Sequence, residues 1–399
     1  MLYTKKIEEI TYQDVVDFCN GQIRENINLD YKESISESLA KTIAAMANTW
    51  GGLIIIGVED NDSKPKLPVK GIKLEEHLLE QINNIILNNI TPPVFPEIQI
   101  CPSDDNKTAL IVIRISQSNM TPHAIRGNTK VYIRTNTSNE PEELATIDRI
   151  LWLINRREKS IELKNQFFNK SQMRLQKLLN RNIPIEYGDF IMSASPLYPY
   201  EIMIDYRKLI EDNFLKQMMV QKSNYYFPSN INNVCFKPIQ SGSYSLQHTQ
   251  SDSIYYEEIN CYGFFYHRQN MTLIKNTDEI KTPQYLCPLR TILIYLDLFL
   301  ESMEKFYSSL GYWGFIEIKI NLNNISNVDF EDLSIPGDYS PNITRPVDND
   351  LSIIKEVLRK DLSEKRRELV TDIFSELAWN IGFPQIDKKK IEKLFEKGW

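Results

Sequence analysis

The sequence predicts an α/β (α+β) protein of two domains, each a mixture of strands and helices. The chain has 399 residues, which exceeds the ~100 to 200 residues of one ordinary domain. Strand-like and helix-like segments alternate up to residue 158, whereas later residues are richer in aromatic side chains between Asn, Ser and Gln. We therefore expect a domain over 1–158 with a mixed sheet flanked by helices, a helical connector over 159–182, and an α+β domain over 183–399.

The first segments predict a short helix and then a strand. A helix start at Thr11 precedes an amphipathic stretch that ends before residue 24. Polar and apolar residues alternate over 28–35, which is the pattern of a half-buried strand. Asp30 and Lys32 then share one face of that strand.

A helix and a second strand follow directly. The spacing of Ser34–Glu37 indicates a capping box, and apolar residues at helical spacing continue to the glycine pair 51–52. The uninterrupted apolar run 53–56 predicts a buried strand. Strand, helix and strand together bring Asp60 back beside Asp30.

The remaining elements come from periodicity and from turn residues. Expected helices cover 74–89, 142–157, 164–182 and 289–310, with one long or broken helix over 351–379, and expected strands cover 98–100, 109–115, 130–135 and 315–320.

The segment from Glu25 to Asp60 carries a family resemblance. It reads Glu25-x4-Asp30-Tyr31-Lys32, then Ala47-Asn48-Thr49-x-Gly51-Gly52-x4-Gly57-Val58-x-Asp60. This pattern resembles the Schlafen-type AlbA domain of prokaryotes and of vertebrate Schlafen proteins. The resemblance extends over about residues 10–158, through Gly71-Ile72, Thr91-Pro92-Pro93-Val94, residues 111–115, Pro122-His123 and residues 131–135.

The resemblance implies a metal-dependent endoribonuclease site. The three carboxylates of that site fall on Glu25, Asp30 and Asp60, and the family's lysine falls on Lys32. Asp30 stands where the nuclease pattern usually has Glu. The implied cofactor is Mg2+ or Mn2+, which oxygen ligands suit, and the implied substrate is structured RNA such as transfer RNA. A role in bacterial defence against phage and a homodimer are further implications.

A second interpretation is a regulatory protein that binds DNA or RNA without cutting it, since many relatives are described only as nucleic-acid-binding modules. A third is an interaction protein with a scaffolding N-terminal domain. His123 is open to two interpretations, a surface loop residue or an acid–base group.

The charge distribution supports a nucleic-acid partner locally and not globally. The net charge is −7, and residues 1–155 hold 15 Lys and Arg against 21 Asp and Glu. Between Asn106 and Asn139, however, there is no acidic residue. The basic residues of this stretch are Lys107, Arg114, Arg126, Lys130 and Arg134. Because phosphate neutralisation is a local event, such a stretch is sufficient for backbone contacts.

Other classes of function are not indicated. The chain lacks the Gly-x-x-x-x-Gly-Lys phosphate loop, so we expect no nucleotide cofactor. We expect no membrane segment and a cytoplasmic location, because no apolar run approaches ~18 residues. The five cysteines lie far apart, which predicts reduced thiols and no zinc ribbon.

Overall fold

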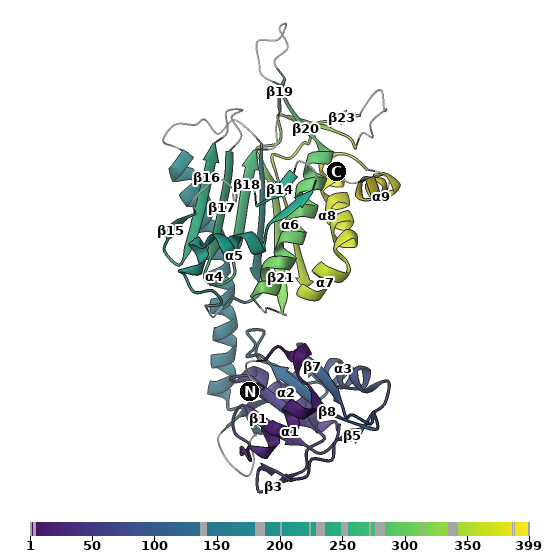
Figure 1. The fold of residues 1–399 in the computed structure, drawn as a ribbon. Coiled ribbons are helices and arrows are strands. Elements are labelled where there is room, and N and C mark those ends of the chain that lie inside the picture. Colours follow the sequence, from purple (N-terminus) through teal and green to yellow (C-terminus); the bar gives the residue numbers. More distant parts are fainter. Residues whose placement is uncertain are drawn as a thin grey trace. The chain divides into compact units, whose positions relative to one another are not determined.

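The computed structural model divides the chain into two compact units, unit 1 (Met1–Ser160) and unit 2 (Ile161–Trp399) (Figure 1). It describes residues 2, 5–135, 142–179, 188–199, 202–222, 225–228, 236–248, 254–270, 273–275, 284–310, 312, 314–333, 342–384, 386 and 388–397. Residues 136–139 of the acid-free stretch, residues 180–182 of the expected connector and Cys235 lie outside these ranges.

The larger sheet of unit 1 has the strand order β1-β2-β8-β5, and β7 also pairs with β8. β1 and β2 are parallel, and the other pairs are antiparallel. The strands are β1 (Leu29–Lys32), β2 (Gly52–Ile56), β5 (Ile72–Lys73), β7 (Glu97–Pro102) and β8 (Thr108–Ile115). The expected strand–helix–strand unit is therefore confirmed.

Alternation along β2 fills a core on each face of this sheet. Leu53 and Ile55 pack with η1 (Ile7–Glu9) and α1 (Tyr12–Asn20). Ile54 and Ile56 pack with α2 (Ser38–Asn48) and α3 (Leu78–Asn89). A strand covered on both faces is apolar throughout, as the run 53–56 predicts.

A second sheet of unit 1 has the order β11-β10-β9-β6. Val131 of this sheet packs on Leu153, near the start of α4 (Ile147–Leu179), while β10 also contacts α2. Its strands are β6 (Ile90–Thr91), β9 (Ala124–Ile125), β10 (Lys130–Arg134) and β11 (Glu142–Leu144), and a separate hairpin joins β3 (Asp60–Asn61) to β4 (Lys64–Pro65).

Helix boundaries follow the sequence at Thr11 and depart from it at Ser34. Thr11 and Asp14 form the reciprocal capping box of α1. No capping box forms at Ser34, because α2 begins only at Ser38, and its N-cap residue Glu37 makes no side-chain cap hydrogen bond. Ser36 and Ser38 instead hydrogen-bond each other.

The expected helices over 142–157 and 164–182 are one continuous helix in the structure. α4 runs from Ile147 to Leu179, and the preceding residues Glu142–Leu144 form β11 against β10. Residues 142–144 therefore form a strand and not the start of a helix, because they pair with β10.

Unit 2 is built on one antiparallel sheet with the order β15-β16-β17-β18-β12-β21-β24. The strands are β12 (Asp189–Pro196), β15 (Lys237–Ile239), β16 (Gly242–His248), β17 (Ile254–Asn260), β18 (Phe265–Asn270), β21 (Phe315–Asn323) and β24 (Asp350–Leu358). Smaller elements are η2 (Lys208–Ile210), α5 (Asp212–Gln217), β13 (Val220–Lys222), β14 (Tyr225–Phe227), β19 (Leu273–Lys275), β20 (Gln284–Pro288), β22 (Val328–Glu331), β23 (Ile343–Thr344), α7 (Arg359–Glu364) and α9 (Lys388–Lys397).

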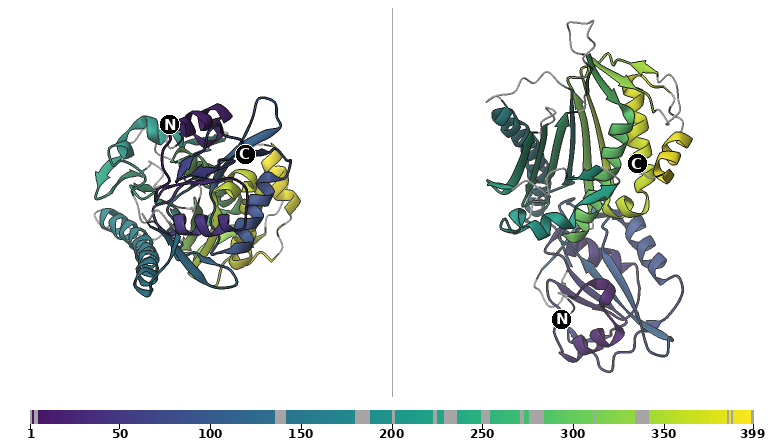
Figure 2. Two further views of the ribbon diagram at one scale, coloured as in Figure 1. Left: turned by 90° about the horizontal axis from the view of Figure 1, so that it is seen from below. Right: turned by 45° about the horizontal axis from the view of Figure 1, so that its top comes forward.

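Helices cover both faces of this sheet (Figures 1 and 2). α6 (Leu289–Ser309) and α8 (Arg366–Ile381) pack on one face with the main core. Phe168, Leu175 and Leu179 of α4 pack on the other face, against aromatic residues of β17 and β18. The aromatic residues that mark the second half of the sequence are therefore largely core residues.

The expectation of a helix over 351–379 is wrong at its start. Asp350–Leu358 is the edge strand β24, which pairs with β21 over nine residues before α7 and α8 begin. In β24 only Ile353 and Val357 are buried. Residues four positions apart lie on the same face of a helix and also on the same face of a strand, so this spacing does not distinguish the two. Long-range pairing with β21 decides between the two.

The described cysteines Cys19, Cys101, Cys261 and Cys287 are free and buried, as the sequence predicts. Within the described ranges, no helix is long and apolar enough to cross a membrane.

Candidate functional site

Asp30 is the centre of the candidate site, and it is almost closed to solvent. Its side chain is 1% exposed, and Oδ1 lies 2.9 Å from Nη1 of Arg134, whose side chain is 0% exposed. Oδ2 lies 2.7 Å from Nζ of Lys32, which is 26% exposed. Nη2 of Arg134 also donates to the carbonyl oxygens of Asn26 and Leu29. The guanidinium group therefore ties β10 to the start of β1.

Glu25 lies beside this ion pair in the loop before β1. Its Oε1 accepts a hydrogen bond of 2.7 Å from the backbone N–H of Tyr31. Burial raises the pKa of Glu25, and the negative charges of Asp30 and Asp60 raise it further, against the Tyr31 hydrogen bond and the charge of Lys32. The four residues that the resemblance selects are thus close enough to act on one another electrostatically.

Asp60 is exposed at the start of the β3–β4 hairpin. Two contacts hold this hairpin against the loop that carries Glu25. The backbone N–H of Glu25 donates to the carbonyl of Ser63 at 2.8 Å, and Nε2 of Gln22 donates to the carbonyl of Pro65 at 2.8 Å. The hairpin contacts explain how a residue 35 positions after Glu25 influences its pKa.

These carboxylates do not fit a shared metal ion in this structure. Among the described residues, no three Asp, Glu, His or Cys side chains lie close enough together to hold one. Arg134 and Lys32 already occupy the two oxygens of Asp30. An Mg2+ or Mn2+ ion at this position would first require Asp30 to exchange these partners.

Asn48, at the end of α2, joins the helix to the second sheet. It is fully buried, its Nδ2 donates to the carbonyls of His123 and Tyr132 at 2.9 Å each, and its Oδ1 accepts from the N–H of His123 at 2.8 Å. The next residue, Thr49, accepts from the N–H of Arg134. Asn48 and Thr49 therefore position β10, and with it Arg134, the partner of Asp30.

Gly51 is needed for the close approach of α2 and β8. Its φ is +71°, and a Cβ atom there would lie 2.4 Å from the carbonyl oxygen of Ile115. Only glycine combines this φ with this proximity.

His123 is neither a surface residue nor a proton carrier at neutral pH. Its side chain is buried, and Nδ1 lies 2.7 Å from the carbonyl oxygen of Pro92. Burial lowers the pKa of His123 to about 4. The ring is neutral at physiological pH, and both interpretations drawn from the sequence are wrong.

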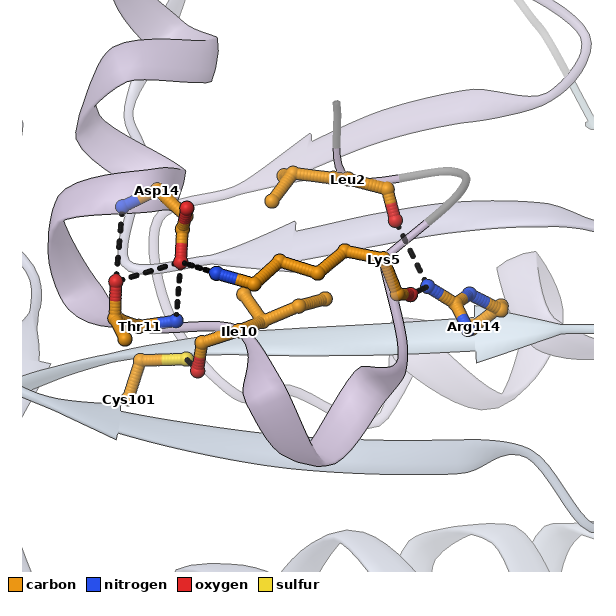
Figure 3. A network of polar contacts seen from close by, with 7 residues as sticks. All are labelled: Leu2, Lys5, Ile10, Thr11, Asp14, Cys101 and Arg114. Carbon is orange, nitrogen blue, oxygen red and sulfur yellow. Dashed lines mark hydrogen bonds and ion pairs between the residues drawn. The ribbon is translucent and has the colours of Figure 1, made fainter.

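Two of the five basic residues are engaged by protein partners. Arg134 binds Asp30. Arg114 donates to the carbonyl oxygens of Leu2 and Lys5 at 2.8 and 2.7 Å (Figure 3). It also pairs with Glu97 at 3.1 Å. The Arg134 side chain is 0% exposed, which leaves it no access to a phosphate in this arrangement, whereas that of Arg114 is 24% exposed and engaged by these protein partners. Whether Arg114 belongs to a backbone track stays a prediction.

Figure 3 shows Arg114 in contact with the chain segment that precedes α1. The chain before α1 crosses β7 and β8, and Lys5 of this segment pairs with Asp14 at 2.7 Å while Cys101 donates to the carbonyl of Ile10. Arg114 anchors the start of this segment, so its role is to hold the N-terminus on the sheet.

The other three basic residues are exposed. Arg126 and Lys130 stand at the two ends of the β9–β10 turn, and Lys107 lies in a separate turn 3.5 Å from Asp105. Alternation along β10 puts Lys130 and Tyr132 on one face with Arg134.

A further cation, which sequence reasoning missed, joins this surface. Nζ of Lys41 in α2 lies 4.9 Å from the centre of the Tyr132 ring. Nothing in the sequence marks Lys41, because it is separated from β10 by about ninety positions. We use the name β10 face for Lys41, Lys130 and Tyr132 together with Arg126 in the adjoining β9–β10 turn.

Comparison with known proteins agrees with this geometry. The family model for Schlafen, AlbA_2 matches residues 25–143. These residues form a Schlafen AlbA_2 domain. It contains all four residues of the carboxylate site and all five basic residues, and it indicates a nucleic-acid-binding function with DNA or RNA as the partner.

Two other comparisons add little. The N-terminal domain of a RecG-related protein from Nitrosomonas europaea, known from a solution NMR structure, is 16% identical over 35% of this chain and 97% of that domain, with a TM-score of 0.27. No curated protein matches the chain. The Schlafen AlbA_2 match leaves unit 2 without an assigned family.

Proposed function

We propose that the Schlafen AlbA_2 domain binds structured RNA through the β10 face. The observation that carries this proposal is that Lys41 lies over the Tyr132 ring and that Lys130 shares the strand face of Tyr132. Arg126 adds an exposed cation in the adjoining β9–β10 turn. Lysine and arginine neutralise phosphates, and an aromatic ring offers a stacking surface to an unpaired base. The acidic net charge of the chain does not oppose this, because phosphate contacts are local.

Fluorescence anisotropy with labelled transfer RNA and with a DNA duplex of similar length tests the proposal. Lys130→Gln and Arg126→Gln should each weaken RNA binding several-fold at about 0.1 M salt, because each removes a phosphate contact. Lys73→Gln in β5 is the matched control, since Lys73 is exposed in the same unit and outside the β10 face. Equal losses in all three variants would contradict a localised surface.

A second candidate function, RNA cleavage, is favoured by the environment of Glu25. An acid with a raised pKa beside two further carboxylates is typical of acid–base sites. The Glu25 carboxylate would take the proton of a ribose 2'-hydroxyl, and the 2'-oxygen would attack the adjacent phosphorus. Lys32 would stabilise the charge on the phosphate oxygens, and the 5' oxygen would leave with a proton from water.

No step of this chemistry goes through a metal ion, because the carboxylates do not fit one here. Incubation of transfer RNA with the full chain, with Mn2+ or with EDTA, decides whether an ion takes part. Fragments that vanish in Glu25→Gln and Asp60→Asn would support cleavage at this site. If the wild-type protein binds RNA and the RNA stays intact, cleavage is refuted and only the binding function remains.

Transfer RNA as the substrate, a role in defence against phage and a homodimer are the finer parts of this proposal, and they rest on the family resemblance. Sedimentation of the chain with and without RNA addresses the dimer. A cleavage comparison between transfer RNA and an unstructured RNA of the same length addresses the substrate.

A further inference from the structure

A cavity in unit 2 combines charged, polar and aromatic side chains. It lies between α4 and the sheet strands β12 and β21, and its volume is about 220 Å3. All its lining residues belong to unit 2. It is therefore separate from the Schlafen AlbA_2 domain, and an inference about it does not rest on the proposed function.

The register of the sheet gathers polar side chains on the α4 face. β12 and β21 pair so that Ser193 lies opposite Lys319 and Ser195 lies opposite Glu317. The alternate residue Ile318 points to the other face, into the core with α6. Since strand alternation sends every second side chain to one face, these four polar residues line the cavity together.

The cavity carries one positive charge in excess. Lys164 of α4 forms an ion pair with Glu317, and both side chains are largely buried. Nζ of Lys319 lies 4.0 Å from the centre of the Phe168 ring. Among the described residues, no carboxylate pairs with Lys319, because Lys164 already holds Glu317. The ammonium group of Lys319 thus lines the cavity without a direct ion pair in the described part of the chain, although Glu317 attracts it electrostatically.

The environment of Lys319 disfavours its own charge. Burial lowers the pKa of Lys319, and the charge of Lys164 acts in the same direction, while Glu317 opposes both. An anion in the cavity would reverse this effect, since an opposite charge nearby favours the protonated amine. Binding an anion and protonating Lys319 therefore reinforce each other.

The remaining wall limits the size and the chemistry of a ligand. The Ser193 side chain is buried at the cavity, while Oγ of Ser195 donates to the carbonyl of Pro196. Phe168 and Phe264 form an apolar side. A volume of about 220 Å3 lies below the ~300 to 1,000 Å3 of pockets for drug-sized ligands. The space suits a small anion with room for a short carbon skeleton.

We propose that this cavity binds a phosphate group, either as inorganic phosphate or on a small phosphomonoester. Lys319 supplies the charge that meets the anion, Lys164 neutralises Glu317, and the hydroxyl of Ser193 donates a hydrogen bond. The phosphate dianion has several acceptor oxygens, which matches ammonium and hydroxyl donors arranged around one space.

Isothermal titration calorimetry of the full chain with inorganic phosphate and with glycerol 3-phosphate tests the proposal. The wild-type protein should bind at least one of them, and the tighter of the two identifies the source of the phosphate group. Lys319→Gln should weaken binding at least about ten-fold, as expected for a lost charge-assisted hydrogen bond. Lys216→Gln, an exposed lysine in α5 outside the cavity, should bind as the wild type does.

A third variant separates binding from a structural role of Lys319. Lys319→Arg keeps the charge at every accessible pH, so it should retain affinity within a few-fold. As the pH rises from 7 toward the ordinary lysine pKa of 10.5, the wild-type protein should lose affinity because Lys319 loses its proton, whereas Lys319→Arg should not. Absence of heat with both ligands, or equal affinity in the wild type and in Lys319→Gln, would overturn the proposal.

Discussion

Arg134 and Asp30 form an ion pair at 2.9 Å between two side chains that have essentially no contact with solvent. The two residues lie 104 positions apart, in β10 and β1. Their contact joins the two sheets of the Schlafen AlbA_2 domain beside Lys32, whose Nζ lies 2.7 Å from Oδ2 of Asp30.

Removing the arginine alone should destabilise unit 1 strongly. Arg134→Gln leaves the buried Asp30 carboxylate without its main partner, for which a loss of about 3–5 kcal/mol is expected. Because the chain has two compact units, the free energy for unit 1 is best read from hydrogen exchange of the β1 and β10 amides. The double variant Asp30→Asn/Arg134→Gln should recover part of the loss.

The matched control is Arg126→Gln, since Arg126 is exposed in the β9–β10 turn. It should change the same free energy by no more than about 0.5 kcal/mol. A loss in Arg134→Gln as small as in Arg126→Gln would show that the ion pair does not hold the sheets together.

The raised pKa of Glu25 predicts a specific pH dependence of stability. The folded state holds this proton more tightly than the unfolded state, so stability is greatest below the ordinary pKa of about 4.5. It should decline as the pH rises through the folded pKa and stay level above it. Glu25→Gln should remove this decline, and its gain over the wild type should appear only above about pH 4.5.

Hydrogen exchange of the β1 amides at pH 4, 5.5 and 7 measures this dependence in both proteins. Gln keeps an oxygen that can accept the hydrogen bond from Tyr31, so the comparison isolates the charge. Parallel pH profiles for the two proteins would show that Glu25 titrates normally.

Asn48 should be as important to the fold as a core residue. Asn48→Ala removes three buried hydrogen bonds to the backbone of His123 and Tyr132, which should cost at least about 2 kcal/mol. Exchange should accelerate most in β9 and β10. Asn88→Ala, at an exposed position of α3, is the control and should change stability little.

Two glycines with positive φ separate backbone strain from steric overlap. Gly51 and Gly127 have φ values of +71° and +90°, but only Gly51 has atoms near the position of a Cβ. Gly127→Ala should cost about 1–2 kcal/mol for the left-handed conformation. Gly51→Ala should cost a further 1–3 kcal/mol or so, because a carbonyl oxygen must move. Equal losses would mean that the overlap relaxes freely.

Local patterns in the sequence predict the parts of this fold that depend on neighbours along the chain. The capping box at Thr11 and the buried strand 53–56 are of this kind. The half-buried strand expected over 28–35 is wrong in its burial, because β1 covers only Leu29–Lys32 and its residues 29–31 are all buried. The start of the 351–379 segment was predicted wrongly, because helical spacing and strand pairing fit the same residues until β21 is present as a partner.

The sequence indicates which acidic residues belong to the candidate site, but it does not indicate which basic residues are exposed there. The acid-free stretch suggests five exposed basic residues, yet Arg134 is buried against Asp30 and Arg114 is only 24% exposed beside Glu97, and both acids come from other strands. Lys41 reaches the site from α2, far away in sequence. Counter-charges of this kind depend on tertiary packing, which local sequence patterns do not contain.

The salt dependence of RNA binding tests the central claim most directly. Dissociation constants for transfer RNA are measured from 50 to 300 mM KCl with the wild-type chain and with Arg126→Gln/Lys130→Gln. If the β10 face binds the RNA backbone, affinity falls steeply with salt, and the double variant has a slope lower by about two, one for each lost phosphate contact. Binding that is insensitive to salt, or equal slopes in the two proteins, would contradict the account.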